Sequence, residues 1–222
     1  MISSRFAGDH LQYQGQRKKL INQLKKKGIQ SARVLEVMSA IPRHLFMESG
    51  FVGFAYQDQA FPISAGQTIS QPYTVAFQTE LLDPHERQKV LEVGTGSGYQ
   101  TAVLVELGLR VYTIERIKCL YQTSSALLRN LDFGSQCFYG DGYAGLPTYG
   151  PFDRILITAG APEIPGALKN QLKIGGVLVA PIGPQSKQVM TRCERISEME
   201  FQETYHGDFI FVPMLKGKSD TE

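Results

Sequence analysis

A short β-type run followed by three closely spaced glycines restricts the fold of this chain most. Residues 89–93 are predicted to form a strand and residues 99–107 a helix, and the turn between them reads Gly94-Thr95-Gly96-Ser97-Gly98. Gly94 permits a tight turn because glycine adopts left-handed backbone conformations without steric cost. Gly96 lets a ligand approach the backbone, and Gly98 lets the helix pack closely on the strand. We therefore expect a strand–turn–helix unit with a ligand site at the turn.

Strands and helices alternate after this unit. The apolar runs predict strands at 111–115, 136–139, 154–158 and 177–182, with later candidates at 187–196 and 208–214, and helices at 117–130 and 165–172. Repeated β-α-β units with apolar strands indicate a mostly parallel sheet covered by helices on both faces. Right-handed crossovers then give a doubly wound, Rossmann-like α/β core.

The residues before the core have a different pattern. Helices are predicted over 14–27, from the N-cap Ser31 to Pro42, and over 73–82. Residues 43–72 contain several glycines and prolines without periodicity, and ordered loops of that length are usually functional. We expect an N-terminal extension (1–82) packed on a core (83–222), effectively one domain, which the length of 222 residues also favours.

Composition excludes several classes of protein. The net charge of +2 argues against a dedicated nucleic-acid binder. No apolar run is long enough to span a membrane, and the N-terminus lacks a secretory signal. The three cysteines, Cys119, Cys137 and Cys193, are too far apart for a zinc knuckle or redox pair, so we expect free thiols in a reducing compartment. The expected protein is a cytoplasmic monomer without nucleic-acid or membrane partners.

Acidic residues stand at or near the ends of three predicted strands. Glu115 ends the second strand, where a carboxylate can bond both hydroxyls of a ribose. Asp141 lies just after the third strand, where it can accept from an adenine amino group, and Glu92 lies inside the first strand. Each of them alone is as compatible with a surface or capping role. Together they indicate an adenosine ligand at the carboxyl ends of the strands.

Two adenosine ligands compete for this site. Dinucleotide-binding turns usually read GxGxxG, and here Tyr99 occupies the position of the third glycine. Glu92 would repel a pyrophosphate but would suit the cationic amino-acid end of S-adenosylmethionine. We therefore favour S-adenosylmethionine over NAD as the cofactor.

The residues after the fourth strand narrow the choice of methyl acceptor. The run Thr158-Ala159-Gly160-Ala161-Pro162 offers neither an aromatic platform nor an amide, which disfavours nitrogen methylation. Scattered histidines and no compact ligand cluster disfavour a metal-assisted O-methyltransferase. A carboxylate is already ionised near neutral pH and needs neither metal nor base, only placement and exclusion of water.

Motifs along the chain make it similar to the protein-L-isoaspartate O-methyltransferase family. The matching runs are Ile41-Pro42-Arg43-His44, Ala55-Tyr56-Gln57-Asp58, Gly66-Gln67-Thr68-Ile69-Ser70-Gln71-Pro72-Tyr73, Leu91 to Ala102, Ile114-Glu115-Arg116, Gly140-Asp141-Gly142, Ala161-Pro162-Glu163-Ile164-Pro165, Gln171-Leu172-Lys173 with Gly175-Gly176, and Phe211-Val212-Pro213. The Thr68-Ile69-Ser70 segment is specific to the family, whereas most Rossmann-like methyltransferases share the glycine loop.

The resemblance implies methyl transfer from S-adenosylmethionine to the α-carboxyl group of L-isoaspartyl residues in damaged proteins and peptides (EC 2.1.1.77), leaving S-adenosylhomocysteine. The ester then gives a succinimide, part of which returns to aspartate, so the reaction initiates repair. No metal is implied. Ser70 is the implied catalytic residue, although by itself it is equally a turn serine that bonds backbone. The expected cofactor contacts are Thr68, Ile69, Ser70, Glu92, Gly94, Thr95, Gly96, Ser97, Gly98, Glu115, Arg116, Asp141 and Gly142.

Two other functions stay open on sequence alone. One is an S-adenosylmethionine-dependent enzyme that acts on RNA or a small molecule, which would not need the Thr68–Ser70 segment. The other is a module that binds the cofactor without turnover.

Overall fold

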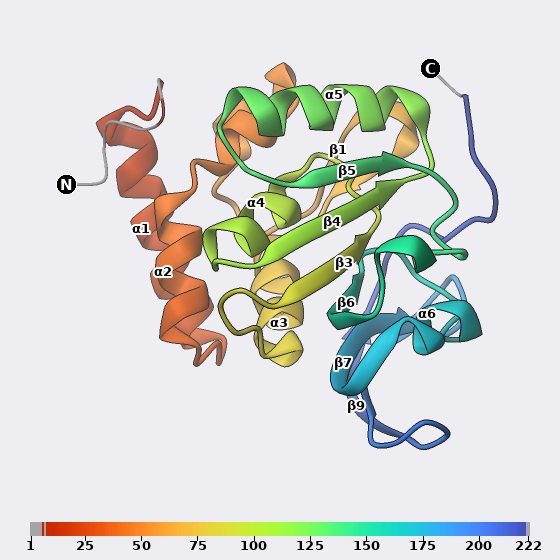
Figure 1. Ribbon diagram of the computed structural model, residues 1–222. Helices are drawn as coiled ribbons and strands as arrows, with labels where there is room; N and C mark the ends of the chain where they lie inside the picture. The colour runs from red at the N-terminus through yellow and green to blue at the C-terminus, as the bar shows by residue number, and fades with distance from the viewer. Residues whose placement is uncertain (1–5, 7, 221–222) are drawn as a thin grey trace.

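A central sheet organises the structure, a computed structural model that describes Phe6 and residues 8–220. Its seven strands run in the order β5-β4-β3-β6-β7-β8-β9 (Figure 1). Neighbours from β5 to β7 pair in parallel, whereas β8 pairs antiparallel with β7 and β9. The strands are β3 (Lys89–Val93), β4 (Arg110–Glu115), β5 (Gln136–Tyr139), β6 (Phe152–Ile157), β7 (Leu172–Ile182), β8 (Gln188–Arg195) and β9 (Phe201–Phe209). This arrangement confirms the predicted α/β fold class.

The sheet separates two apolar cores. On one face, side chains of the N-terminal helices, α3, α4 and α5 form a single buried cluster with alternate residues of the strands, for example Val90 and Val111. On the other face, Leu91 and Ile155 pack with Leu168 of α6. The helices are α1 (Leu11–Lys26), α2 (Ala32–Ala40), α3 (Pro72–Leu82), α4 (Tyr99–Glu106), α5 (Lys118–Asn130) and α6 (Gly166–Asn170). Because successive residues of a strand face opposite ways, one run of apolar residues supplies both cores.

The segment between α2 and α3 is ordered, as its composition predicted. It consists of three short 3₁₀ turns, η1 (Arg43–Phe46), η2 (Ser49–Phe54) and η3 (Ser64–Gly66), and a two-stranded antiparallel ribbon of β1 (Phe61–Pro62) and β2 (Thr68–Ile69). The ribbon brings the chain back toward the end of β3 before α3 begins.

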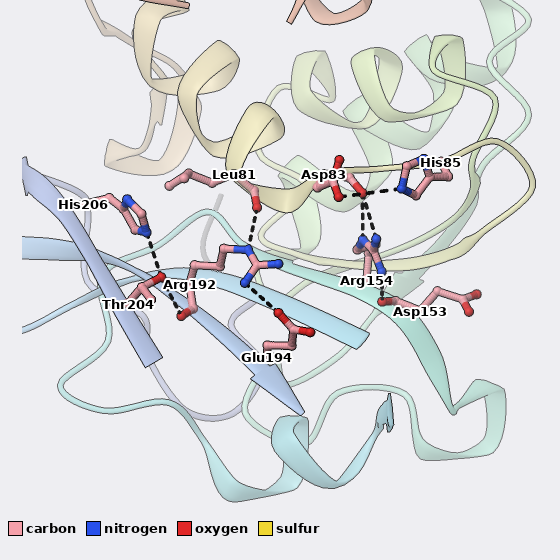
Figure 2. A network of polar contacts seen from close by, with 9 residues as sticks. All are labelled: Leu81, Asp83, His85, Asp153, Arg154, Arg192, Glu194, Thr204 and His206. Carbon is pink, nitrogen blue, oxygen red and sulfur yellow. Dashed lines mark hydrogen bonds and ion pairs between the residues drawn. The ribbon is translucent and has the colours of Figure 1, made fainter. Parts of the chain in front are cut away.

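Two arginines of the sheet hold the C-terminal end of α3 (Figure 2). Arg154 donates from Nε and Nη2 to the carbonyl of Asp83 at 3.1 and 2.8 Å, and Arg192 donates from Nε to the carbonyl of Leu81 at 3.3 Å. These carbonyls are among those that a helix leaves without internal partners, and cations are favoured at that end of the helix dipole. The contacts tie α3 to β6 and β8.

The last predicted strand, 208–214, is wrong. The chain pairs as β9 over Phe201–Phe209 and then leaves the sheet. Beyond β9, the amide of Gly160 donates to the carbonyl of Val212 at 2.8 Å, and the amide of Met214 donates to the carbonyl of Gly160 at 2.7 Å. Apolar residues there indicated a strand, but they pack beside the loop after β6 and not along the sheet edge.

We expect Leu24→Ala to lower the free energy of unfolding of the whole protein by about 2–5 kcal/mol in one cooperative transition. Leu24 of α1 is fully buried in the cluster that reaches the sheet, so its loss leaves a cavity in a shared core. Leu11→Ala on the same helix is the control, because Leu11 is 84% exposed. Denaturant unfolding followed by circular dichroism measures both. A separate early transition in Leu24→Ala would show that α1 belongs to an independent unit.

Candidate active site

A pocket opens where the carboxyl ends of β3, β4 and β6 meet. Residues that directly follow each of these strands line it: Gly94 after β3, Arg116 after β4 and Thr158 after β6. Its apolar wall includes Ile114, Ile117 and Met214. Of the residues that the sequence predicted for the site, the pocket is lined by Thr68, Ile69, Ser70, Gly94, Thr95, Gly96, Ser97, Glu115, Arg116 and Gly142.

The glycine turn forms the floor of the pocket. Gly94 and Gly96 have φ angles of 97° and 52°, in the left-handed region that favours glycine. A Cβ on Gly94 would lie 2.5 Å from the hydroxyl oxygen of Thr158. That hydroxyl donates to the carbonyls of Gly94 and Val93 at 2.6 and 3.0 Å, so the loop after β6 braces the turn after β3. Thr158 lines the pocket and was not among the predicted site residues.

Glu115 connects the end of β4 to the glycine turn. Its Oε2 accepts from the amide of Gly96 at 3.0 Å, and its Oε1 accepts from the amide of Ile117 at 2.9 Å. The residue is 5% exposed, so the carboxylate sits in the wall of the pocket. An ionised carboxylate has about four acceptor sites, so both oxygens keep capacity for hydroxyl donors.

The segment Gln67–Ser70 forms one side of the pocket opening. Ile69 is buried and pairs with Phe61 in the β1–β2 ribbon, while Ser70 is half-buried and lines the pocket. Ile63, which directly follows β1, lies over the glycine turn. Its Cδ1 would be 3.8 Å from a Cβ built on Gly96. The long loop thus brings Ser70 to the same pocket as the glycine turn.

The end of the chain also lines the pocket. Val212, Pro213, Met214 and Leu215 line the pocket after the chain leaves β9. Their position results from the hydrogen bonds to Gly160 described above. The sequence singled out Phe211-Val212-Pro213 as a motif at a substrate-contacting C-terminal edge, but none of these residues was among the expected cofactor contacts.

Comparison with known proteins assigns the chain to a family. The family model for "Protein-L-isoaspartate(D-aspartate) O-methyltransferase (PCMT)" matches residues 15–219. A protein-L-isoaspartate O-methyltransferase of Flavobacterium psychrophilum is 56% identical over 95% of this chain and 99% of its own, and that of Dictyoglomus thermophilum is 45% identical over 95% of each. This chain belongs to the protein-L-isoaspartate O-methyltransferase family.

Solved structures agree with this assignment. The crystal structure of a Plasmodium falciparum protein described as a protein-L-isoaspartate O-methyltransferase, in complex with S-adenosylhomocysteine, superposes with a TM-score of 0.78 at 25% identity, covering 90% of this chain and 98% of the other. A second protein-L-isoaspartate O-methyltransferase superposes with a TM-score of 0.81 at 27% identity, over 89% of this chain and 65% of that longer one. The Rossmann-like fold of this methyltransferase is therefore shown by both topology and comparison.

The pocket of this methyltransferase fits S-adenosylmethionine. Gly94 and Gly96 have no side chains that would fill the floor of the pocket, so a ligand can contact their backbone. The carboxylate of Glu115 lies next to this backbone. Ile114, Ile117 and Met214 give apolar surface suited to an adenine ring. In the described part of the chain, no group of three or more His, Cys, Asp or Glu side chains is placed to hold a metal.

Three predicted site residues do not line the pocket. Gly98 packs under the loop, because a Cβ there would lie 3.2 Å from Leu128 of α5. Oδ1 of Asp141 accepts from the amide of Tyr143 at 2.9 Å and shapes the turn after β5. Glu92 points toward α4, where it bonds Thr101, and it is not among the residues that line the pocket.

Glu92 is a fully buried carboxyl group below the pocket. Its Oε2 accepts from the hydroxyl of Thr101 on α4 at 2.5 Å, and its Oε1 has no hydrogen-bond partner among the described residues. Burial raises the pKa of Glu92 to about 7, and the Thr101 hydroxyl opposes part of this rise. Burial disfavours the charged form, so the group is held close to its protonation midpoint at neutral pH.

We expect Glu92→Gln to be more stable than the parent at pH 8 but not at pH 5. The pKa of Glu92 rises from 4.5 to about 7 on folding, so in that range the folded protein holds a proton that the unfolded chain lacks. The free energy of unfolding therefore falls as pH rises through this window. Glutamine avoids that loss, which is on the order of 3 kcal/mol because one pKa unit corresponds to about 1.4 kcal/mol.

Thermal unfolding at pH 5 and pH 8 tests this expectation, with Glu163→Gln as the control because Glu163 is exposed. If parent and Glu92→Gln show the same pH dependence of the melting temperature, the buried carboxyl group does not titrate as described.

Proposed function

We propose that the residues of this pocket carry out the family's reaction, with Ser70 orienting the acceptor carboxylate. The reaction is methyl transfer from S-adenosylmethionine to the α-carboxyl group of L-isoaspartyl residues in damaged proteins and peptides. The observation that carries the proposal is the meeting of Ser70 and the glycine turn in one pocket, although they lie on separate parts of the chain.

The cofactor is assigned to the deep part of the pocket. Gly94 to Ser97 would hold it from below, Glu115 would accept from its ribose hydroxyls, and Thr68 to Ser70 would cover it. Arg116 and Gly142 complete the set of pocket-lining contacts that we propose. S-adenosylmethionine supplies a methyl group on a positively charged sulfur, and transfer leaves the neutral thioether S-adenosylhomocysteine.

Glu92 has an indirect role in this proposal. Glu92 does not line the pocket and accepts from the hydroxyl of Thr101 in the first turn of α4. We assign it to fixing α4 against β3 and not to touching the amino-acid end of the cofactor. Asp141 and Gly98 likewise shape the loops that contact the cofactor.

The residues around the acceptor have two tasks. An isoaspartyl α-carboxylate is ionised at neutral pH, so no base has to remove a proton before it attacks. The Ser70 hydroxyl donates to one carboxylate oxygen and leaves the other directed at the methyl carbon. The segments Gln67–Ser70 and Val212–Leu215 keep water out, which strengthens that hydrogen bond and prevents hydrolysis.

We also propose that the enzyme is a cytoplasmic monomer that acts on proteins without nucleic-acid or membrane partners. Three free cysteines, Cys119, Cys137 and Cys193, suit a reducing compartment, and the small net charge of +2 suits neither a nucleic-acid nor an anionic lipid surface. In the described part of the chain, no helix combines the length and apolar character needed to cross a membrane.

We expect Ser70→Ala to lower kcat on an isoaspartyl peptide about ten- to hundredfold, since a hydrogen bond to a charged group contributes about 1.5–3 kcal/mol. The affinity for S-adenosylhomocysteine should stay near parental because little volume is lost. Ser64→Ala, in the same loop but outside the pocket, is the matched control. The same peptide with a normal aspartyl residue in place of the isoaspartyl residue should accept no methyl group. A parental rate in Ser70→Ala would reduce Ser70 to a loop residue.

We expect Glu115→Ala to weaken binding of S-adenosylhomocysteine about ten- to hundredfold, because buried ligand hydroxyls lose a charged acceptor. Isothermal titration calorimetry measures the dissociation constant. Glu36→Ala is the control for the change in charge, because it removes an exposed carboxylate on α2. An unchanged dissociation constant in Glu115→Ala would exclude the ribose contact.

A further inference from the structure

Arg43 lies behind Ser70 and bonds its backbone. Nη2 of Arg43 donates to the carbonyl of Ser70 at 2.8 Å, and Nε donates to the carbonyl of Ala55 at 3.1 Å. The side chain is fully buried although it does not line the pocket. One guanidinium thus joins the start of η1, the end of η2 and the proposed catalytic serine.

The same guanidinium also touches the floor of the site. Its Cζ lies 4.8 Å from the ring centroid of Tyr99, which lines the pocket at the first position of α4. No carboxylate among the described residues forms an ion pair with Arg43. Burial lowers the pKa of Arg43 to about 10, which still leaves it charged at neutral pH. A buried cation without a paired anion is costly, so carbonyl oxygens and a ring face must compensate for the lost water.

Asp58 holds the segment on the other side of Ser70. Its Oδ1 accepts from the amide of Tyr73 at 2.8 Å, and its carbonyl accepts from Nε2 of Gln71 at 3.0 Å. Oδ2 of Asp58 pairs with Nζ of Lys27 at 2.6 Å, and the Asp58 side chain is only 2% exposed. Asp58 therefore acts as a cap for the first turn of α3, where amides lack helical partners.

A third set of contacts fixes the segment that carries Arg43 and Asp58. Nδ1 of His44 lies 2.8 Å from the hydroxyl of Tyr56, and Nη1 of Arg17 donates to the same hydroxyl at 3.0 Å. All three side chains are buried. These contacts connect the segment that carries Arg43 and Asp58 to α1. Arg43 and Asp58 in turn hold the chain at Ser70 and just after it.

We propose that Arg43 is a positioning residue that sets the orientation of Ser70 for methyl transfer, with Asp58 holding the opposite end of the same segment. The proposal rests on the catalytic role of Ser70 proposed above. A hydrogen bond to the carbonyl of Ser70 restrains the peptide group that follows it, and this limits the positions that the Ser70 hydroxyl can take. The guanidinium fork suits this task because it bonds two carbonyls at once in fixed geometry, which an ammonium group does not.

Arg154 provides a matched control from the opposite end of α3. It is also buried, at 6% exposed, and also donates from Nε and Nη2 to a main-chain carbonyl, that of Asp83 (Figure 2). It has no part in the pocket. Replacing either arginine by lysine therefore makes the same chemical change with the same kind of lost bond, and only Arg43 is next to Ser70.

The experiment combines single variants with a double-mutant cycle. For Arg43→Lys we expect kcat on an isoaspartyl peptide to fall about ten- to hundredfold, with the dissociation constant of S-adenosylhomocysteine within about threefold of the parent. Rates are normalised to the fraction of protein that binds S-adenosylhomocysteine. Arg154→Lys should lower the melting temperature but keep kcat within about twofold. In the double variant Arg43→Lys/Ser70→Ala, kcat should stay within about threefold of Ser70→Ala alone, because Arg43 acts through that hydroxyl.

Two results would overturn the inference. If the losses of Arg43→Lys and Ser70→Ala multiply in the double variant, Arg43 does not act through Ser70. If Arg154→Lys slows turnover as much as Arg43→Lys, the effect is general destabilisation. A parental rate in Ser70→Ala would instead overturn the proposed function together with this inference. Should Arg43→Lys not fold, the same cycle with Asp58→Asn replaces it, and multiplying losses there have the same meaning.

Discussion

The left-handed turn after β3 is the constraint on which the rest of the site depends. Gly94 and Gly96 adopt φ angles that other residues avoid, and a side chain on Gly94 would collide with the Thr158 hydroxyl. The turn therefore ends β3 abruptly, and the amide of Gly94 still reaches the carbonyl of Ile114 in β4 at 2.9 Å. These contacts bring the carboxyl ends of three strands to one place. The bare backbone left there is what allows a ligand to lie against it.

The parts that close the site come from segments far from the turn in sequence. The β1–β2 ribbon carries Ser70 to the pocket from the N-terminal side, and the chain after β9 brings Val212 to Leu215 from the other. Both depend on hydrogen bonds to main-chain groups: Arg43 and Asp58 hold the first segment, and Gly160 holds the second. The glycine turn and the two segments that flank it are each held by their own hydrogen bonds. Such a site suits a reaction that depends on positioning the reactants and excluding water more than on acid or base catalysis.

The two carboxyl groups near the glycine turn, Glu115 and Glu92, have different surroundings. Glu115, whose oxygens are held by the amides of Gly96 and Ile117, lies at the wall, where a carboxylate is useful to hydroxyl donors. Glu92, two residues before the turn, is buried against α4 on the same face of the sheet, and burial raises its pKa. Two carboxyl groups from adjacent strands thus have different environments, because Glu115 stands at the end of its strand beside the pocket and Glu92 lies before the end of its strand, under α4.

The sequence alone determined the elements of the core, the glycine turn, and the position of Glu115 at a strand end, because apolar periodicity and glycine conformations are local properties. It also indicated Thr68 to Ser70 through a family-specific motif. It misplaced the last strand, which is β9 at Phe201–Phe209, and it did not indicate that Glu92 lies outside the pocket lining. Only the tertiary structure decided that Glu92 bonds α4 below the pocket, where residues 210–215 return, and that Arg43 reaches Ser70. Those features depend on contacts between residues distant in the chain, for which a single sequence has no periodic or local signal.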